Sequence, residues 1–187
     1  MVLRAAFDGG LLMEVLQVTS ELEPMVALYK ERKPKRVLEI GCWDGGTLKE
    51  WLTRGTPEVV VAVDLEHRNR DQYSQWRHAD TSLYVYAGES QKTEQIASMW
   101  MHAPYDWVFI DGDHGAWGVS TDVETCLPMI REGGLLLLHD IQGGSNHEDI
   151  YPPRIEFEKL SASGYQTWEW VDPASMSWAH GIGVVQL

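Results

Sequence analysis

Short apolar runs alternate with stretches of helical periodicity from residue 34 onward, and this alternation predicts an α/β protein. Several runs are apolar on both faces, as in "VVVAVDL" at 59–65, which is typical of central strands in a parallel sheet. Between them, amphipathic stretches such as 119–130, with Val119 and Val123 on one face, predict helices. The predicted parallel strands cover residues 36–41, 59–65, 83–88, 107–112 and 133–140.

The two ends of the chain depart from this alternation. Residues 8–32 carry apolar side chains at mixed helical spacing around Pro24, so they predict two short helices that cover one edge. Residues 165–171 and 181–187 are strand-like and joined by a short loop, which predicts an antiparallel pair. We therefore expect a Rossmann-like, doubly wound, seven-stranded sheet, mostly parallel with an antiparallel last strand. It forms one domain over 1–187, in which 1–33 is a helical segment packed on the sheet.

Composition and charge narrow the class of partner. The length of 187 residues suits one domain, and the formal net charge of −13 opposes binding to phosphate backbones, which makes a nucleic-acid substrate unlikely. The only cysteines, Cys42 and Cys126, are too few and too far apart for a disulfide framework, so we expect buried reduced thiols. No apolar run approaches the ~18 residues of a membrane span, and we expect a cytoplasmic protein without membrane contact.

A glycine-rich turn, "LEIGCWDGGT" at 38–47, follows the first predicted strand. Such a turn lets a ligand approach the backbone at the start of a helix, although a tight turn without a ligand has the same composition. A dinucleotide-binding turn would require glycine where Trp43 stands. The spacing is instead Glu39, one residue, Gly41, three residues, Gly45. This resembles the first motif of class I S-adenosylmethionine-dependent methyltransferases, in which the turn holds the methionine part of the cofactor.

The ends of the next two strands agree with a nucleoside ligand. Asp64 ends the second strand about 20 residues after the turn, where a carboxylate can accept both ribose hydroxyl hydrogens. Dehydrogenases share this feature, so Asp64 indicates a nucleoside ligand without distinguishing S-adenosylmethionine from a nicotinamide cofactor. "AGES" at 87–90 resembles the family's segment beside the adenine. The resemblance implies S-adenosylmethionine as cofactor, with these candidate contacts: Glu39, Gly41, Cys42, Trp43, Gly45, Thr47, Asp64, Gly88, Glu89, Ser90 and Asp111.

The segment 105–141 resembles one branch of O-methyltransferases, which includes the cephalosporin-hydroxylase-like proteins and the macrolide sugar O-methyltransferases. The shared pattern is an aspartate that ends strand four, a histidine three residues later, and a fifth strand that ends in two polar residues. In that branch the aspartate binds a metal and the histidine is the general base. The resemblance implies these catalytic roles for Asp111 and His114, whereas Asp113 is expected to be a solvated turn residue.

The chemistry of methyl transfer explains why such residues are needed. A hydroxyl oxygen is a poor nucleophile while protonated, and a divalent cation lowers its pKa while a nearby base takes the proton. Asp111 and Asp140 end neighbouring strands and offer hard oxygen ligands. His139 departs from the family, which usually has an acid or amide there. Imidazole favours manganese, iron or zinc over magnesium. Alternatively, His139 points into the core and only the two aspartates bind.

The sequence thus predicts an S-adenosylmethionine-dependent O-methyltransferase with a divalent cation, Mg or Mn, bound by Asp111, His139 and Asp140. Its expected partner is a small molecule with a hydroxyl group, such as a glycoside or natural-product intermediate. A homo-oligomer is compatible with the resemblance. Three alternatives stay open: a metal-independent methyltransferase that uses His114 or His139, a nicotinamide-dependent oxidoreductase, which Trp43 opposes, and a nucleoside-binding protein without catalysis.

Overall fold

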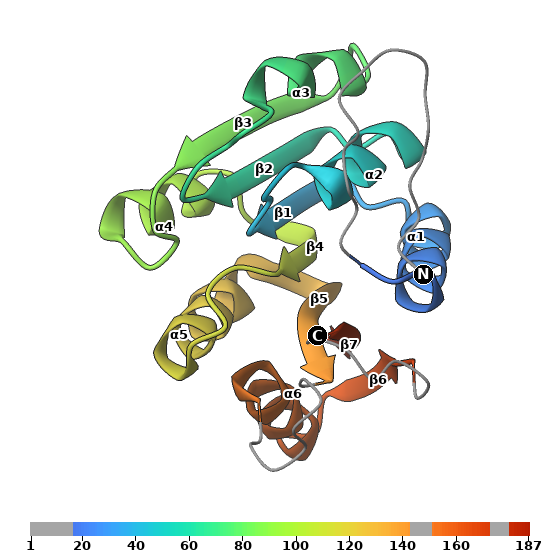
Figure 1. Ribbon diagram of the computed structural model, residues 1–187, viewed down its shortest axis with the longest axis vertical. Coiled ribbons are helices and arrows are strands. Elements are labelled where there is room, and N and C mark those ends of the chain that lie inside the picture. The colour runs from blue at the N-terminus through green and yellow to red at the C-terminus, as the bar shows by residue number, and fades with distance from the viewer. Residues whose placement is uncertain (1–16, 143–150, 173–179) are drawn as a thin grey trace.

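The computed structural model describes residues 17–142, 151–172 and 180–187, which form one sheet with helices on both faces (Figure 1). In chain order the elements are α1 (Thr19–Arg32), β1 (Arg36–Ile40), α2 (Gly46–Arg54), β2 (Val59–Asp64), α3 (Arg70–Trp76), β3 (Ser82–Ala87), α4 (Thr93–Trp100), β4 (Tyr105–Ile110), α5 (Ala116–Cys126), a 3₁₀ turn (Leu127–Met129), β5 (Ile130–Gln142), α6 (Pro152–Ala162), β6 (Gln166–Trp170) and β7 (His180–Gln186).

The strand order across the seven-stranded sheet is β3-β2-β1-β4-β5-β7-β6. Strands β1 to β5 are parallel, and β7 runs antiparallel between β5 and β6. The predicted doubly wound sheet with an antiparallel last strand is therefore confirmed. Because the order reverses between β1 and β4, their carboxyl ends form the switch point where such folds bind ligands.

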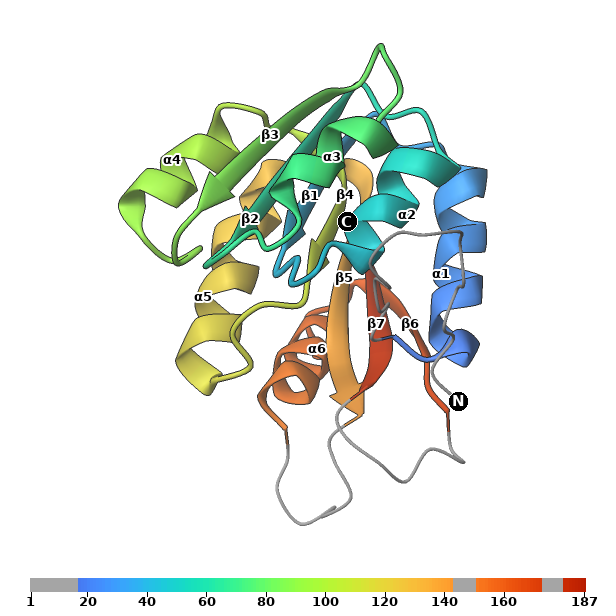
Figure 2. The same cartoon turned by 45° about the horizontal axis from the view of Figure 1, so that its top comes forward.

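Two apolar cores lie on opposite faces of the sheet, one under α1, α2 and α3 and the other under α4, α5 and α6 (Figure 2). An aromatic cluster dominates the first. The ring centroid of Tyr29 lies 4.8 Å from that of Trp51 and 5.3 Å from that of Trp107, which belongs to β4. The Tyr29 hydroxyl also donates to the carbonyl of Trp51 at 2.9 Å. These contacts hold α1 against α2 and the sheet.

The prediction of two short N-terminal helices around Pro24 is wrong for the described residues, because α1 runs without a break from Thr19 to Arg32. Pro24 lies in the second turn, where its missing N–H removes a single helical hydrogen bond. Glu21, Met25 and Tyr29 are spaced four residues apart on the buried side of α1. Burial of this continuous side outweighs the local cost of proline. Residues 1–16 lie outside the described residues.

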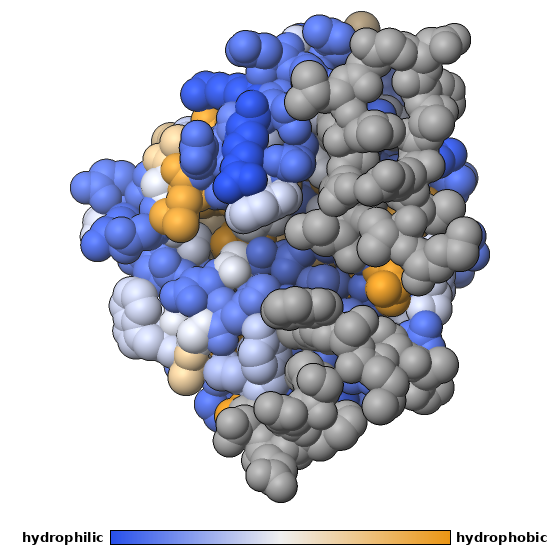
Figure 3. Space-filling model, viewed as in Figure 1, coloured by the Kyte–Doolittle hydropathy of each residue, from blue (hydrophilic) through white to orange (hydrophobic). Residues whose placement is uncertain are grey.

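Two other boundaries differ from the prediction. The helix expected over 119–130 is α5, which ends at Cys126 before the 3₁₀ turn, and the strand expected over 133–140 is the longer β5, Ile130–Gln142. Helix α2 lies between Gly45 and Gly55. Both cysteines are buried free thiols, as expected. Hydrophobic residues form only small, separate patches on the face seen in Figure 3, which suits the strongly acidic composition. Among the described residues, no helix combines the length and apolarity that crossing a membrane requires.

Candidate active site

The glycine turn after β1 lies directly against the end of β4. The amide of Gly41 donates to the Val63 carbonyl of β2, and the amide of Asp111 donates to the Ile40 carbonyl of β1, both at 2.8 Å. Gly41 and Gly45 have positive φ angles of 85° and 83°. The turn therefore closes over the switch point between β1 and β4, as the strand order requires.

The Asp64 carboxylate at the end of β2 organises the turn. Its Oδ2 accepts hydrogen bonds from the amides of Cys42 and Trp43, the latter at 2.8 Å. The Trp43 side chain is 51% exposed, and the Arg68 guanidinium stacks 3.7 Å from the ring centroid. Asp64 and the turn thus meet at the carboxyl end of β2, and the ribose contact of Asp64 stays a prediction.

Glu39 is completely buried beneath the same turn. Burial raises its pKa to about 8; the hydrogen bond from the Thr47 hydroxyl at 2.9 Å opposes this, while the charges of Asp111 and Asp64 add to it. The Trp51 indole is the other hydrogen-bonding neighbour of this carboxyl group, and it also opposes the rise in pKa.

The end of β3 contributes a second polar group. The amide of Gly88 donates to the Asp64 carbonyl at 2.8 Å, and Ser90 is buried. Glu89 is instead exposed and paired with Lys92 at 3.1 Å. Gln91 and Asp122 form a neighbouring polar pair that no sequence motif predicts, in which the Gln91 amide donates to the buried Asp122 carboxylate at 3.0 Å. Burial raises the pKa of Asp122 to about 6.

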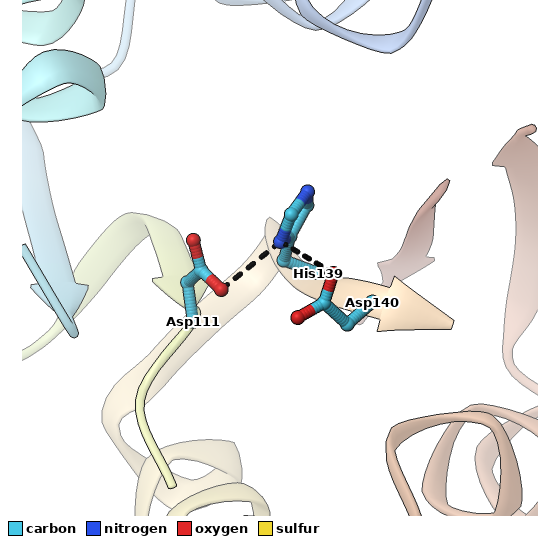
Figure 4. Close-up of side chains that lie close together, drawn as sticks. All are labelled: Asp111, His139 and Asp140. Carbon is cyan, nitrogen blue, oxygen red and sulfur yellow. Dashed lines mark hydrogen bonds and ion pairs between the residues drawn. The ribbon is translucent and has the colours of Figure 1, made fainter. Parts of the chain in front are cut away.

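The polar ends of β4 and β5 come together as one cluster (Figure 4). His139 Nδ1 lies 3.0 Å from Asp111 Oδ1 and 3.1 Å from Asp140 Oδ1. His114 Nε2 lies 3.4 Å from Asp111 Oδ1 and 3.2 Å from Asp140 Oδ2. Its other ring nitrogen contacts the Tyr151 hydroxyl at 3.2 Å. All four predicted residues therefore share a single site, and Asp113 is exposed outside it.

Opposite charges reinforce one another in this cluster. Burial alone would raise the pKa of Asp111, but the adjacent His139 and His114 outweigh it and lower that pKa. Burial alone would lower the pKa of His139, yet the Asp111 charge and contacts with Asp111, Asp140 and Glu21 hold it well above its ordinary range. The pKa of His114 is also raised, chiefly by the Asp111 carboxylate. The carboxylates and the histidines of this cluster therefore stabilise each other's charged forms.

Backbone geometry explains how two consecutive residues of β5 face one site. Neighbouring residues in a regular strand point to opposite faces. Asp140 instead has a φ of 60°, in the left-handed region, and the pairing of β5 with β7 is irregular between His139 and Gln142. This local bend brings the Asp140 carboxylate beside His139. Strained backbone of this kind is concentrated at functional sites.

Two residues near the start of α1, neither of them predicted from the sequence, complete the cluster. Gln17 Nε2 donates to Asp111 Oδ2 at 2.9 Å. Glu21 is completely buried, and its Oε1 lies 3.2 Å from His139 Nε2. Because Glu21 and His139 are 118 residues apart, no local motif connects them. The only signal in the sequence was an acid at a position of α1 that helical periodicity places on the buried side.

A doubly wound sheet with a glycine turn, an acid after β2 and this polar cluster is the arrangement of a Rossmann-like enzyme domain. A profile of a methyltransferase domain family matches residues 38–141. The chain belongs to this methyltransferase domain family and has a Rossmann-like fold.

The individual proteins that resemble this chain share less than 30% of its sequence. The chain is 27% identical over 113 residues to demethylmacrocin O-methyltransferase of Streptomyces fradiae; the match covers 57% of this chain but only 27% of that protein. Its fold is similar to that of an O-methyltransferase from Bacillus cereus in complex with S-adenosylhomocysteine (TM-score 0.70, 17% identity, 88% and 80% of the two chains). It also resembles the mycinamycin-pathway methyltransferase MycE in complex with Mg and S-adenosylhomocysteine (TM-score 0.59, 19% identity, 88% and 48% of the two chains).

Proposed function

We propose that residues 1–187 form one methyltransferase domain, an O-methyltransferase that acts on a hydroxyl group of a small natural-product molecule such as a glycoside. In this proposal a divalent cation assists the reaction. The observation that carries it is the cluster of Asp111, His139 and Asp140, in which one ligand atom from each residue lies within 4.8 Å of the others. The similarity to a demethylmacrocin O-methyltransferase supports this type of acceptor.

The cofactor is assigned to the sheet edge formed by the glycine turn and the ends of β2 and β3. In this assignment the residues of the turn receive the methionine part, Asp64 the ribose, and the Gly88–Ser90 segment the adenine. Glu39 lies beneath the turn, where its carboxylate would pair with the methionine ammonium. Among the candidate cofactor contacts, Glu89 has the least support, because its exposed carboxylate is already paired with Lys92.

The donor set fits a divalent cation. Asp140 is 5% exposed, and its Oδ1 has no hydrogen-bond partner among the described residues, although His139 Nδ1 is close. Two carboxylates and one imidazole converge there, a combination that accepts Mn²⁺ or another first-row ion as well as Mg²⁺. When bound, the cation supplies charge that lowers the pKa of the acceptor hydroxyl and fixes its position.

His114 is proposed to receive the proton. In the transfer, the hydroxyl oxygen of the acceptor attacks the methyl carbon, the carbon–sulfur bond breaks, and its electron pair stays on sulfur, which becomes a neutral thioether. The hydroxyl proton passes to His114 Nε2. That nitrogen faces Asp111 and Asp140 at 3.2–3.4 Å, and it would be free to accept the proton if the two carboxylates held a cation instead. Tyr151 at Nδ1 orients the ring.

A metal-independent methyltransferase is the second candidate, and His139 favours it. Both ring nitrogens of His139 already contact carboxylates, those of Asp111 and Glu21, so an imidazolium supplies an internal positive charge. In that case the carboxylates need no metal, and methyl transfer continues in the presence of a chelator.

Calorimetric titration with S-adenosylhomocysteine and with NAD tests the cofactor. We expect a signal for the first only, and tight NAD binding without S-adenosylhomocysteine binding would refute the proposal. Transfer of a labelled methyl group to a panel of glycosides, with and without EDTA, then tests the metal. Loss of transfer with EDTA and recovery with Mn²⁺ are expected, and unchanged transfer selects the metal-independent candidate. His114→Ala should lose turnover while its affinity for S-adenosylhomocysteine stays the same.

A further inference from the structure

Glu21 and Asp111 lie on opposite sides of the His139 ring. Figure 4 shows one ring nitrogen turned to the carboxylates of Asp111 and Asp140, while the other points away from both. That second nitrogen, Nε2, meets Glu21 Oε1 at 3.2 Å. The His139 ring is 6% exposed and Glu21 is fully buried, so no bulk solvent competes for this contact. The ring is therefore held from both edges.

The other hydrogen bonds of Glu21 show which atom donates in its contact with His139, Nε2 of the ring or Oε1 of the carboxylate. Glu21 Oε1 accepts from the amide of Val18 at 2.9 Å, and Oε2 accepts from the amide of Gly181 in β7. Both of these described backbone neighbours are N–H donors, so the two oxygens of Glu21 act as acceptors. The proton of the His139 contact consequently lies on Nε2. A neutral ring with its proton on Nε2 has its lone pair on Nδ1, which faces Asp111 and Asp140.

This is the arrangement of a carboxylate, a histidine and a metal in series, in which the outer carboxylate orients the imidazole and increases its basicity. The outer carboxylate here comes from α1, outside the span that the family profile matches, 38–141. Gln17, just before α1, holds Asp111 in the same way through Oδ2. The start of α1 therefore contacts two of the three candidate ligands.

We infer that Glu21 is a positioning residue that fixes His139 with Nδ1 directed at Asp111 and Asp140, and that it thereby completes a one-nitrogen, two-carboxylate site suited to Mn²⁺ more than to Mg²⁺. The inference rests on the metal-assisted function proposed above. A glutamine cannot replace Glu21, because its NH₂ group has to face either the Gly181 amide or His139 Nε2. Against His139, it favours the ring with the proton on Nδ1, which cannot bind a metal through that atom.

Titration of the full chain with Mn²⁺ and with Mg²⁺, followed by calorimetry, tests the inference. We expect the wild-type protein to bind Mn²⁺ more tightly than Mg²⁺, and Glu21→Gln to bind Mn²⁺ about 10- to 100-fold more weakly. Affinity for S-adenosylhomocysteine should not change in the variant. Glu23→Gln, an exposed residue of the same helix, is the matched control and should bind Mn²⁺ like the wild type.

A spectroscopic measurement on the wild-type protein covers the case in which Glu21→Gln does not fold. Loaded with diamagnetic Zn²⁺, the protein should show ring ¹⁵N shifts of His139 for a proton on Nε2 and a metal on Nδ1. The reverse assignment, or wild-type Mn²⁺ affinity in a folded Glu21→Gln protein, overturns the role of Glu21 and leaves the proposed function intact. A wild-type protein that binds no metal overturns the metal-assisted function and this inference with it.

Discussion

Gly41 and Asp111 approach each other so closely that no side chain fits between them. A Cβ atom built on Gly41 would lie 2.0 Å from the Asp111 carbonyl oxygen and 2.4 Å from its carbonyl carbon. This approach joins the cofactor turn to the strand that carries the first candidate metal ligand. The two halves of the site are therefore positioned by direct backbone packing.

Gly41→Ala should destabilise the fold and disturb both halves of the site. The change adds a left-handed-backbone cost of about 1–2 kcal/mol to a steric clash that forces the turn and β4 apart. Gly164→Ala is the control, because Gly164 has a φ of 92° but open space around its Cβ position. Urea unfolding should show a larger loss of unfolding free energy for Gly41→Ala than for Gly164→Ala. Equal losses would mean that the close approach of Gly41 to Asp111 does not contribute to the free energy of unfolding.

Asp64→Asn should weaken cofactor binding. The variant keeps an oxygen for the amides of Cys42 and Trp43 but loses the charge and one acceptor that the ribose hydroxyls require. Hydrogen bonds to charged groups contribute about 1.5–3 kcal/mol, which corresponds to a roughly 10- to 100-fold lower affinity for S-adenosylhomocysteine. Calorimetry checks this, with Asp71→Asn in α3 as an exposed control. Unchanged affinity would remove Asp64 from the cofactor site.

Glu39→Gln should stabilise the cofactor-free protein in a pH-dependent way. The folded-state pKa of Glu39, about 8, exceeds its ordinary value of 4.5, so the folded protein binds the proton more tightly. The stability of the wild type is therefore full below pH 4.5 and falls as the pH rises towards 8. The glutamine variant lacks this loss and should be more stable by about 2–3 kcal/mol at pH 7.

Thermal melts of Glu39→Gln and wild type between pH 5 and 8.5 measure this difference, which should widen with increasing pH. Glu124→Gln, an exposed glutamate of α5, serves as the control and should show no such trend. A constant gap across the range would indicate that Glu39 is not protonated in the folded protein.

Asp140→Asn should separate metal binding from folding. Asparagine tolerates the left-handed backbone at φ 60° and preserves the shape of the side chain, so we expect a change in unfolding free energy below about 1 kcal/mol. Loss of one anionic ligand should reduce Mn²⁺ affinity at least about tenfold. Asp140→Ala is the comparison, since alanine loses the ligand and also fits the left-handed region poorly. If both variants bind Mn²⁺ like the wild type, Asp140 is not a ligand.

Much of the fold was predictable because its signals are local. Continuous apolar runs mark β1, β2 and β4. The helices were less predictable: Pro24 predicts a break in α1 that the buried side of the helix overrides, and neither α3 nor α6 was predicted. Local sequence signals predict an element correctly only where tertiary packing favours the same structure. In α1 it does not, because contacts with aromatic rings distant in sequence stabilise the continuous helix.

The order of the strands, the glycine turn and the polar residues that follow the strands can all be predicted from the sequence. These follow from periodicity and from the conformational preferences of glycine, which act over a few residues. Tertiary structure alone decided that His139 and Asp140 face the same site, through the left-handed backbone at Asp140, and that Glu21 supports His139 from 118 residues away. Such pairings arise from packing of α1 and β7 around β5, a long-range arrangement that no short stretch of sequence encodes.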